Sequence, residues 1–280
     1  MEKLMKFGLD VPTTGAYADA RVQAQLALEA EAAGWDGFFI WDTLLGAFAI
    51  IDPWIALTAI ALHTSHIKIG LLALPLPRHR PWLVAGQLAN LDQLSAGRVI
   101  CTVGLGYAES IFTSFGEEGS AQVRAKKLDE GLQILTGLWE KEPFSFEGEY
   151  YTVKDVTLHS KPVQSPRIPL WVVGGWTRRA PLRRAAGFDG VCLDGMNIET
   201  GEVVHTVEEF RECVAYVRAH RTSDAHFEIV MSGETPLDRE QGREMVRLFQ
   251  EAGATWWIEG GYARSFDAFR ERIRSGPPRS

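Results

Sequence analysis

A pair of glycines followed by basic residues forms one candidate binding motif of this sequence. Residues 174–179 read Gly-Gly-Trp-Thr-Arg-Arg and lie between an apolar, strand-like run and a helix-like run. Thr177 is suited to cap that helix, and free N–H groups at a helix N-terminus attract phosphate or carboxylate. We therefore expect an anion site formed by Gly174, Gly175, Thr177 and Arg178. The alternative is a well-capped helix with solvated arginines.

A second glycine-rich segment, Gly104-Leu105-Gly106, matches only part of a dinucleotide-binding fingerprint. The position of the last glycine in that fingerprint is taken by Glu109, so the match is weak. Two interpretations remain open. The glycines either allow a backbone kink where a strand ends, or they allow close approach of a flat ligand that a side chain would block.

Aromatic and basic residues lie near other strand-like ends. Arg78-His79-Arg80 is either a solvated loop or a grip on an anionic cofactor tail. Tryptophans at such positions either fill the core or form an apolar wall for a planar ring. The four that we consider for this wall are Trp41, Trp176, Trp256 and Trp257.

These residues lie at the ends of apolar segments that alternate with helix-like segments along the chain. The predicted strands are Lys6–Pro12, Gly37–Asp42, Ile67–Leu76, Arg98–Gly106, Pro169–Gly175, Gly190–Asp194, Phe227–Glu234 and Thr255–Gly261. The predicted helices are Ala18–Ala33, Asp52–Thr64, Trp82–Ser95, Ala121–Glu140, Arg178–Ala186, Val207–His220, Arg239–Ala252 and Phe266–Ser275. Gly34, Gly97, Gly187 and Gly253 each follow a predicted helix, where a left-handed residue is expected.

Repeated strand-then-helix units without a change of composition predict one domain over residues 1–280, an α/β protein with a single (β/α)8 barrel. Lys141–Ser165, between the fourth helix and the fifth strand, interrupts the alternation. Phe144–Phe146 and Tyr150–Val153 predict a short hairpin there. We interpret this stretch, at about 141–165, as an insertion packed on the barrel. Since chemistry in this fold lies at the carboxyl ends of strands, the candidate residues are expected to meet at one end.

Residue types at those ends argue against other barrel chemistries. None of the seven histidines ends a predicted strand, so we expect no metal site. Lys68 begins its strand, which disfavours a Schiff-base mechanism. Glu109 and Glu234 leave a glycosidase as a remote alternative, because retaining glycosidases place two carboxylates about 5 Å apart.

Composition and charge narrow the class of protein further. Of the 280 residues 46% are apolar, and the net charge is −7, which argues against nucleic acid as a partner. The apolar run Ile67–Leu76 is much shorter than the roughly 20 residues of a membrane span, and the N-terminus does not resemble a signal peptide. Cys101, Cys192 and Cys213 form no close pair. We therefore expect buried, reduced thiols in a cytoplasmic protein without a membrane partner.

Several separate motifs, in the right order, resemble the bacterial luciferase-like monooxygenase family. They are Gly34–Asp42, Leu76–Trp82, Leu91–Arg98, Gly104–Tyr107 with Phe112–Gly116, Glu142–Tyr151 and Lys161–Gln164. The resemblance implies a barrel with a reduced flavin-type cofactor, FMN or the deazaflavin F420, across its mouth. It also implies a homodimer.

Carried onto this chain, the resemblance assigns residues to the cofactor. The ring would lie near Leu74, Gly104, Gly106 and Tyr107, and the phosphate near the 174–178 turn that the residues themselves indicate. Trp176 belongs to the same expected binding set.

One position departs from the family pattern. Relatives with an Asp-His pair after the second strand place an acid/base imidazole there, whereas this chain has Asp42-Thr43. A hydroxyl does not titrate near neutral pH as an imidazole does. The expected catalytic set is therefore Asp42, Thr43 and Glu109, with proton transfer falling to a carboxylate or water.

The expected function is a flavin-dependent oxidoreductase or monooxygenase that uses reduced FMN and O2 on a small, partly apolar substrate. One alternative is an F420-dependent oxidoreductase that transfers a hydride, and another is a flavin-binding protein without catalysis. Because the chain has no Rossmann motif for NAD(P)H, a separate flavin or F420 reductase would recharge the cofactor.

Overall fold

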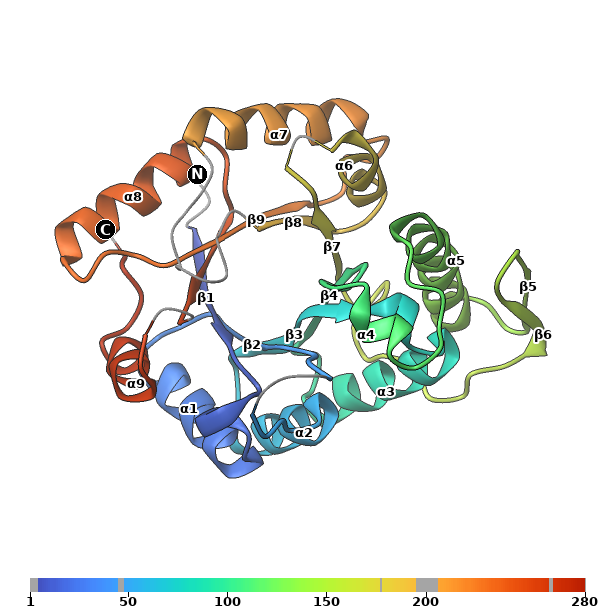
Figure 1. Ribbon diagram of the computed structural model, residues 1–280, viewed down its shortest axis with the longest axis horizontal. Coiled ribbons are helices and arrows are strands. Elements are labelled where there is room, and N and C mark those ends of the chain that lie inside the picture. Colours follow the sequence, from blue (N-terminus) through green and yellow to red (C-terminus); the bar gives the residue numbers. More distant parts are fainter. Residues whose placement is uncertain (1–4, 45–47, 177, 195–205, 262–263, 280) are drawn as a thin grey trace.

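The computed structural model describes residues 5–44, 48–176, 178–194, 206–261 and 264–279. Within these ranges eight parallel strands close into a barrel in the order β1-β10-β9-β8-β7-β4-β3-β2 (Figure 1). The strands are β1 (Lys6–Val11), β2 (Gly37–Ile40), β3 (Lys68–Pro75), β4 (Val99–Gly104), β7 (Leu170–Gly174), β8 (Gly190–Asp194), β9 (Glu228–Gly233) and β10 (Trp256–Gly260). The predicted (β/α)8 barrel is confirmed.

Helices surround this barrel, as Figure 1 shows. They are α1 (Ala20–Ala32), α2 (Pro53–His63), α3 (Pro81–Leu94), α5 (Ala121–Glu140), α6 (Arg179–Ala186), α7 (Val207–His220), α8 (Arg239–Glu251) and α9 (Phe266–Arg274). Short helices that the sequence pattern did not predict follow three strands: η1 (Gly15–Tyr17), η2 (Leu76–Arg78) and α4 (Ser110–Thr113). Side-chain caps fix several helix starts, including a reciprocal capping box between Thr206 and Glu209 at α7. Among the described residues, no helix combines the length and the apolar character that crossing a bilayer requires.

Strand alternation divides the apolar side chains into two layers. The inner layer fills the barrel and centres on Phe39, Trp171 and Trp256, whose ring centroids lie 5.3–6.0 Å apart. Its members are Phe39, Leu72, Ile100, Trp171, Cys192, Val230, Trp256 and Ile258. The larger outer layer lies between strands and helices. The barrel is therefore a packed core, and all three cysteines are buried as predicted.

The insertion forms the predicted antiparallel hairpin, but it packs on a helix rather than on the strands. It consists of β5 (Phe144–Glu147) and β6 (Thr152–Val156), outside α5 in Figure 1. The second strand begins two residues later than predicted. The reason is that the Glu130 carboxylate on α5 accepts the backbone N–H groups of Tyr150 and Tyr151, which are then unavailable to a strand ladder.

The helix-ending glycines follow the prediction with one exception. Gly34, Gly97 and Gly253 have φ angles of 86°, 81° and 110°, in the left-handed region. Gly187 instead has a φ of −84°, so the prediction is wrong there. Its N–H group donates to Arg184 in a right-handed turn that any residue could adopt.

A partly buried carboxylate joins the first helix to the last. Glu29 on α1 accepts hydrogen bonds from Arg270, at 2.6 and 2.9 Å, and from Arg274, at 3.0 Å. Hydrogen bonds from Arg270 are the largest cause that lowers the pKa of Glu29, to about 2. This contact ties together the two helices that meet where the barrel closes.

Candidate active site

Polar side chains that the sequence analysis did not single out line the inner face of the barrel strands. Asp10, Thr102 and Ser232 are buried, and they follow the inner-face positions Gly8, Ile100 and Val230 by two residues. Trp41 donates from its indole Nε1 to Asp10 Oδ1 at 2.8 Å. The Oγ1 atom of Thr102 is buried and has no hydrogen-bond partner in the described part of the chain. The sequence pattern that could have identified these residues is the two-residue period of a strand, which places alternate side chains on the inner face.

Gly104, the last residue of β4, and Gly106, in the turn that follows, have different roles. A Cβ atom at Gly104 would lie 3.2 Å from Val173 and 3.9 Å from Ala73, so Gly104 faces the inside at the carboxyl end of the barrel. Gly106 has a φ of 88° and allows the chain to turn away from the strand. The close-approach interpretation therefore fits Gly104, and the kink interpretation fits Gly106.

The Leu74 side chain does not face the inside of the barrel, and its place near the cofactor ring stays a prediction. β3 changes register between Leu71 and Leu74, and Leu74 pairs with Val103 of the outer layer. A bulge shifts every following side chain to the opposite face. The Leu74 side chain is fully buried in the outer layer, and Ala73 faces Gly104 instead.

An arginine that the sequence analysis did not identify holds the turn after β4. Arg124, on α5, donates from Nη1 to the carbonyl oxygens of Leu105, at 3.3 Å, and Gly106, at 2.8 Å. Its guanidinium lies 5.2 Å from the ring centroid of Phe112. Arg124 is therefore a positioning residue, and Tyr107 projects from this turn with 84% of its surface exposed.

Asp42 is buried between two basic side chains of the segment after β3. Arg78 Nη2 pairs with Asp42 Oδ1, and His79 Nε2 lies 2.7 Å from Asp42 Oδ2. The Asp42 side chain is only 3% exposed. Arg78 and His79 are thus not simply solvated, as one interpretation held. The structure brings an imidazole to the carboxylate that precedes Thr43, which is itself half-buried.

The other candidate carboxylates lie elsewhere. Glu109 is exposed at the start of α4, and a Cβ atom at Gly119 would lie 2.6 Å from its Cγ. Glu234 pairs with Arg264 at 3.4 Å. The two glutamates that would serve a glycosidase thus belong to separate local environments.

The turn after β7 begins α6 without a cap from the residue at its N-cap position. That residue is Arg178, whose exposed side chain makes no capping hydrogen bond, and its N–H group donates to Gly175 at 3.2 Å. Thr177, the expected cap, lies outside the described residues. Gly174 serves packing, because a Cβ atom there would lie 2.8 Å from Val191. Gly175, the backbone turn and the helix N-terminus are therefore the parts suited to an anion.

Of the four tryptophans considered for an apolar wall, Trp176, Trp256 and Trp257 are buried in the two core layers. Trp176 packs on Phe210 in the outer layer, with ring centroids 6.1 Å apart. Trp257 is also in the outer layer, and Trp256 is in the inner core near Lys6, where β1 begins. Trp41 follows the carboxyl end of β2 and donates to Asp10 of the inner face. Strand alternation separates the neighbours Trp256 and Trp257.

The described part of this site contains neither a cluster of metal ligands nor a reactive thiol at Cys101. Across these residues, no group of three or more histidine, cysteine, aspartate and glutamate side chains is placed to hold a metal ion. Burial raises the pKa of Cys101 to about 12, so its thiol stays protonated at neutral pH.

Comparison with known proteins identifies relatives of two kinds, F420-dependent enzymes and FMNH(2)-dependent enzymes. An F420-dependent glucose-6-phosphate dehydrogenase of Amycolatopsis mediterranei is 29% identical over 80% of this chain and 68% of its own length. A second such enzyme, from Kineococcus radiotolerans, is 28% identical over 63% of this chain and 53% of its own length. An FMNH(2)-dependent dimethylsulfone monooxygenase of Pseudomonas putida is 33% identical over 49% of this chain. The match covers only 37% of that monooxygenase.

Solved structures share the fold at low identity. The monooxygenase RslO1 of Streptomyces bottropensis superimposes with a TM-score of 0.80 at 20% identity, covering 96% of this chain and 97% of that one. An F420-dependent secondary alcohol dehydrogenase superimposes with a TM-score of 0.77 at 20% identity, covering 96% of each chain. The model of the luciferase-like monooxygenase family matches residues 5–240. The chain therefore belongs to the luciferase-like monooxygenase family, a family of oxidoreductases.

Proposed function

We propose that this protein is an oxidoreductase that binds a reduced flavin-type cofactor across the carboxyl end of its barrel. The observation that carries the proposal is on β4. The buried Thr102 hydroxyl has no partner, and two residues further Gly104 leaves the inner face open where a side chain would intrude. A buried polar group without a partner is uncommon and is explained by a ligand or water. A planar ring with polar edges fits both features.

The residues also fit a cofactor phosphate. The α6 N-terminus presents backbone N–H groups that its N-cap side chain does not satisfy, and Arg178 stands beside them. Such a terminus favours a doubly charged phosphate through both hydrogen bonds and the helix dipole. Gly175 allows the phosphate to approach the backbone.

F420 is the first candidate for the cofactor, because relatives that match most of this chain are F420-dependent dehydrogenases. Reduced F420 supplies a hydride to its substrate, and the chain would orient the two and hold the proton that accompanies the transfer. Asp42 and His79 hold the segment that contains Thr43, next to Trp41 and Asp10. FMN with O2 is the second candidate, favoured by the dimethylsulfone monooxygenase relative. The substrate class that we propose is small and partly apolar, and a separate reductase recharges the cofactor.

Titration of the apoprotein with FMN and F420, each oxidised and reduced and followed by fluorescence, tests this proposal. The wild type is compared with Thr102→Val and with the matched control Thr136→Val, whose hydroxyl already bonds to Leu132 at 3.0 Å. Thr102→Val should weaken cofactor binding about tenfold, the equivalent of one lost hydrogen bond. It should not lower the unfolding temperature, because it removes a hydroxyl that has no partner. If neither cofactor binds, the proposal is wrong.

We also propose a homodimer formed through α2 and α3. These neighbouring helices expose apolar side chains: Ile55 61%, Leu62 65%, Leu83 59% and Leu94 45%. An exposed apolar face on two adjacent helices is typical of an interface, and a second copy of the chain is the partner that the family resemblance implies.

A further inference from the structure

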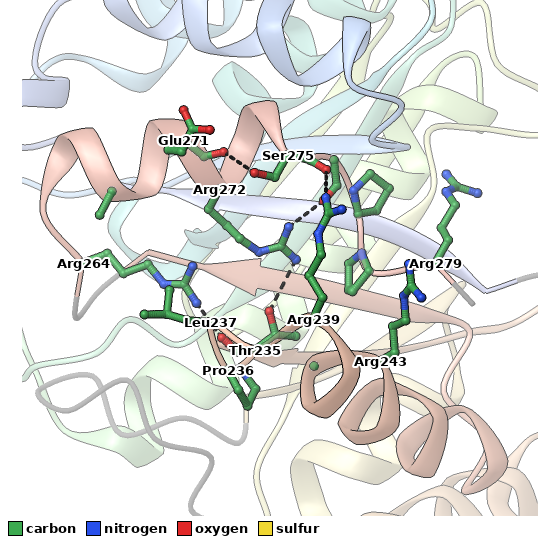
Figure 2. A pocket seen from close by; sticks show the side chains of 15 residues that line it. Thr235, Pro236, Leu237, Arg239, Arg243, Arg264, Glu271, Arg272, Ser275 and Arg279 are labelled. Carbon is green, nitrogen blue, oxygen red and sulfur yellow. Dashed lines mark hydrogen bonds between the residues drawn. The ribbon is translucent and has the colours of Figure 1, made fainter.

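A cavity of about 400 Å³ lies on the outside of the barrel, between α8, α9 and the C-terminal tail (Figure 2). Glu259 of β10 lies beside this cavity. It shares the outer face of the strand with Trp257, whereas Ile258 between them faces the inner layer. The cavity therefore opens on the flank of the barrel and is separate from the proposed cofactor site. Its volume is in the range of small-molecule sites, about 300–1,000 Å³.

Five arginines from four parts of the chain line this cavity. They are Arg239 and Arg243 of α8, Arg264 before α9, Arg272 of α9, and Arg279 of the tail. Arg239 and Arg243 are four residues apart and so lie on the same face of α8. In Figure 2 both side chains rise from the first turns of that helix toward the C-terminal tail.

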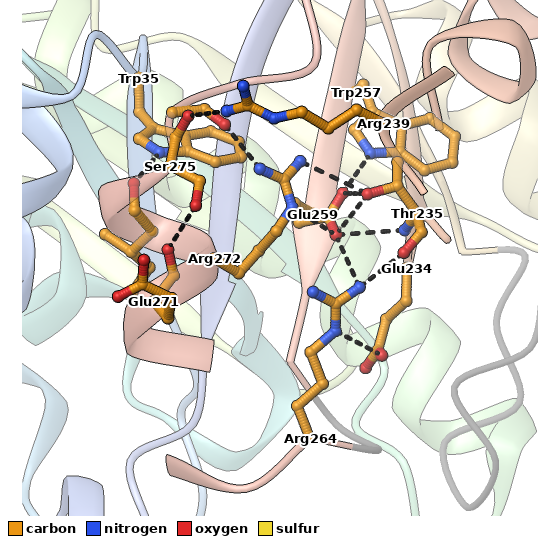
Figure 3. Close-up of polar contacts among 12 residues, drawn as sticks. Trp35, Glu234, Thr235, Arg239, Trp257, Glu259, Arg264, Glu271, Arg272 and Ser275 are labelled. Carbon is orange, nitrogen blue, oxygen red and sulfur yellow. Dashed lines mark hydrogen bonds and ion pairs between the residues drawn. The ribbon is translucent and has the colours of Figure 1, made fainter. Parts of the chain in front are cut away.

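A buried glutamate beside the cavity has its acceptors occupied, as Figure 3 shows. Glu259 is fully buried and accepts hydrogen bonds from the Thr235 hydroxyl, at 2.8 and 2.9 Å, and from Trp257 Nε1, at 3.0 Å. It also pairs with Arg264 and Arg272, each at 3.3 Å. The backbone N–H of Thr235 donates to it as well, at 3.1 Å, so one carboxylate serves two guanidinium groups and three neutral donors.

Hydrogen-bond donors exceed acceptors in this cluster. Arg264 is 10% exposed and pairs with Glu234 and Glu259, yet its buried Nη1 atom has no hydrogen-bond partner among the residues that the structure describes. Such an unsatisfied group in a native protein calls for an acceptor. The neighbouring carboxylates are already engaged by other donors.

Positive charge is also in excess at the open part of the cavity. Arg279 pairs with Asp36 at 2.8 Å. Arg239 bonds only to a neutral acceptor, the carbonyl oxygen of Ser275, at 2.7 Å. Arg243 has no hydrogen bond or ion pair with any residue in the described ranges. The lining carboxylate, Glu271, lies on the opposite side of the cavity from Arg243 in Figure 2.

We propose that this cavity binds a small molecule that carries a phosphate group. Guanidinium groups bind phosphate through paired N–H donors, and Arg239 and Arg243 present two of them at the cavity. Pro236, Leu237 and Pro278 supply apolar walls for the organic part of the ligand. A cavity of about 400 Å³ has the size for a small molecule rather than for a strand or helix of a protein partner. This second site goes beyond the proposed function and does not depend on it.

Calorimetric titration with inorganic phosphate and with phenyl phosphate tests the proposal on the full chain. Arg243→Gln is compared with Arg247→Gln, which removes the same charge from the same helix. Arg247 pairs with Glu244 and Glu251 and does not line the cavity. Arg243→Gln should raise the Kd of both probes at least about tenfold, the equivalent of one charge-assisted hydrogen bond. Arg247→Gln should change Kd less than about twofold, because Glu244 and Glu251 already neutralise the Arg247 charge in an exposed ion pair.

Further outcomes decide against the proposal. Absence of binding by the wild type overturns it, and equal effects of the two arginine variants would show only a general charge effect. Binding lost in Gly175→Val but kept in Arg243→Gln would assign the phosphate to the turn after β7 instead. Phenyl phosphate should bind more tightly than inorganic phosphate, and equal affinity would overturn the role of the apolar walls. Thermal unfolding of each variant confirms that it is folded.

Discussion

The imidazole Nε2 of His79 lies 2.7 Å from the Oδ2 atom of Asp42, although 37 positions separate the two residues in the chain. Arg78 engages the other carboxylate oxygen, so one buried aspartate joins the segments that follow β2 and β3. An imidazole is thus present beside the position where this chain has Thr43 instead of the family's histidine. This imidazole comes from the segment that follows the neighbouring strand β3 rather than from the adjacent residue.

Asp42→Asn should destabilise the protein by roughly 1.5–3 kcal/mol, the usual range for a lost charged hydrogen bond. The reason is that Arg78 would keep its buried charge without a counter-charge. Urea unfolding of Asp42→Asn, Arg78→Gln and the double variant measures the coupling. Strictly additive losses would contradict a direct interaction.

Thr43→His should introduce a second imidazole near Asp42 and change the pH profile of the reaction between about pH 5 and 8. Steady-state rates against pH for both proteins provide the measurement. If Thr43 only supports the loop, the profiles will superimpose and only stability will change.

Gly175→Val should weaken cofactor binding by blocking access to the α6 N-terminus while the protein stays folded. Gly174→Val is the matched comparison. A Cβ atom there would approach Val191 and Leu182 within 2.8 and 2.9 Å, so this variant should lose stability by roughly 1–3 kcal/mol, as overpacking does. Fluorescence titration and thermal unfolding separate the two effects. Unchanged cofactor affinity in Gly175→Val would remove the phosphate site.

Glu29→Gln should destabilise the protein at neutral pH and much less in acid. Hydrogen bonds from Arg270 lower the folded-state pKa of Glu29 from 4.5 to about 2. A depressed pKa means that the contribution is present above the unfolded value and is lost as pH falls from about 4.5 to about 2. Denaturant unfolding of both proteins at pH 7 and pH 3 checks this, and a difference that is the same at both pH values would contradict it.

Leu62→Glu should convert the proposed dimer to a monomer, because a buried charge at the α2–α3 face opposes association. Leu248→Glu on α8 is the control, since that residue is 39% exposed on another side of the barrel. Light scattering during size-exclusion chromatography measures the mass. A monomeric wild type, or equal behaviour of both variants, would exclude this interface.

The sequence by itself determined the barrel and the ends of strands at which to look for chemistry. Hydrophobic period, helix-ending glycines such as Gly34 and the Gly174-Gly175 turn are local features, because they depend on residues a few positions apart. These local features were sufficient to predict the (β/α)8 barrel and the glycines at the carboxyl ends of its strands. The same local rules do not say when a strand changes register, so they did not predict that the Leu74 side chain packs in the outer layer.

Only the tertiary structure decided which distant residues meet. The Asp42–His79 contact, the support of Gly106 by Arg124 and the arginine-lined cavity each join segments that are adjacent only after the barrel closes. Alternation along β10 places Trp256 inside the barrel and Trp257 outside it. Long-range packing and the register of paired strands set these positions, and a bulge of one residue reverses which side chains face the interior.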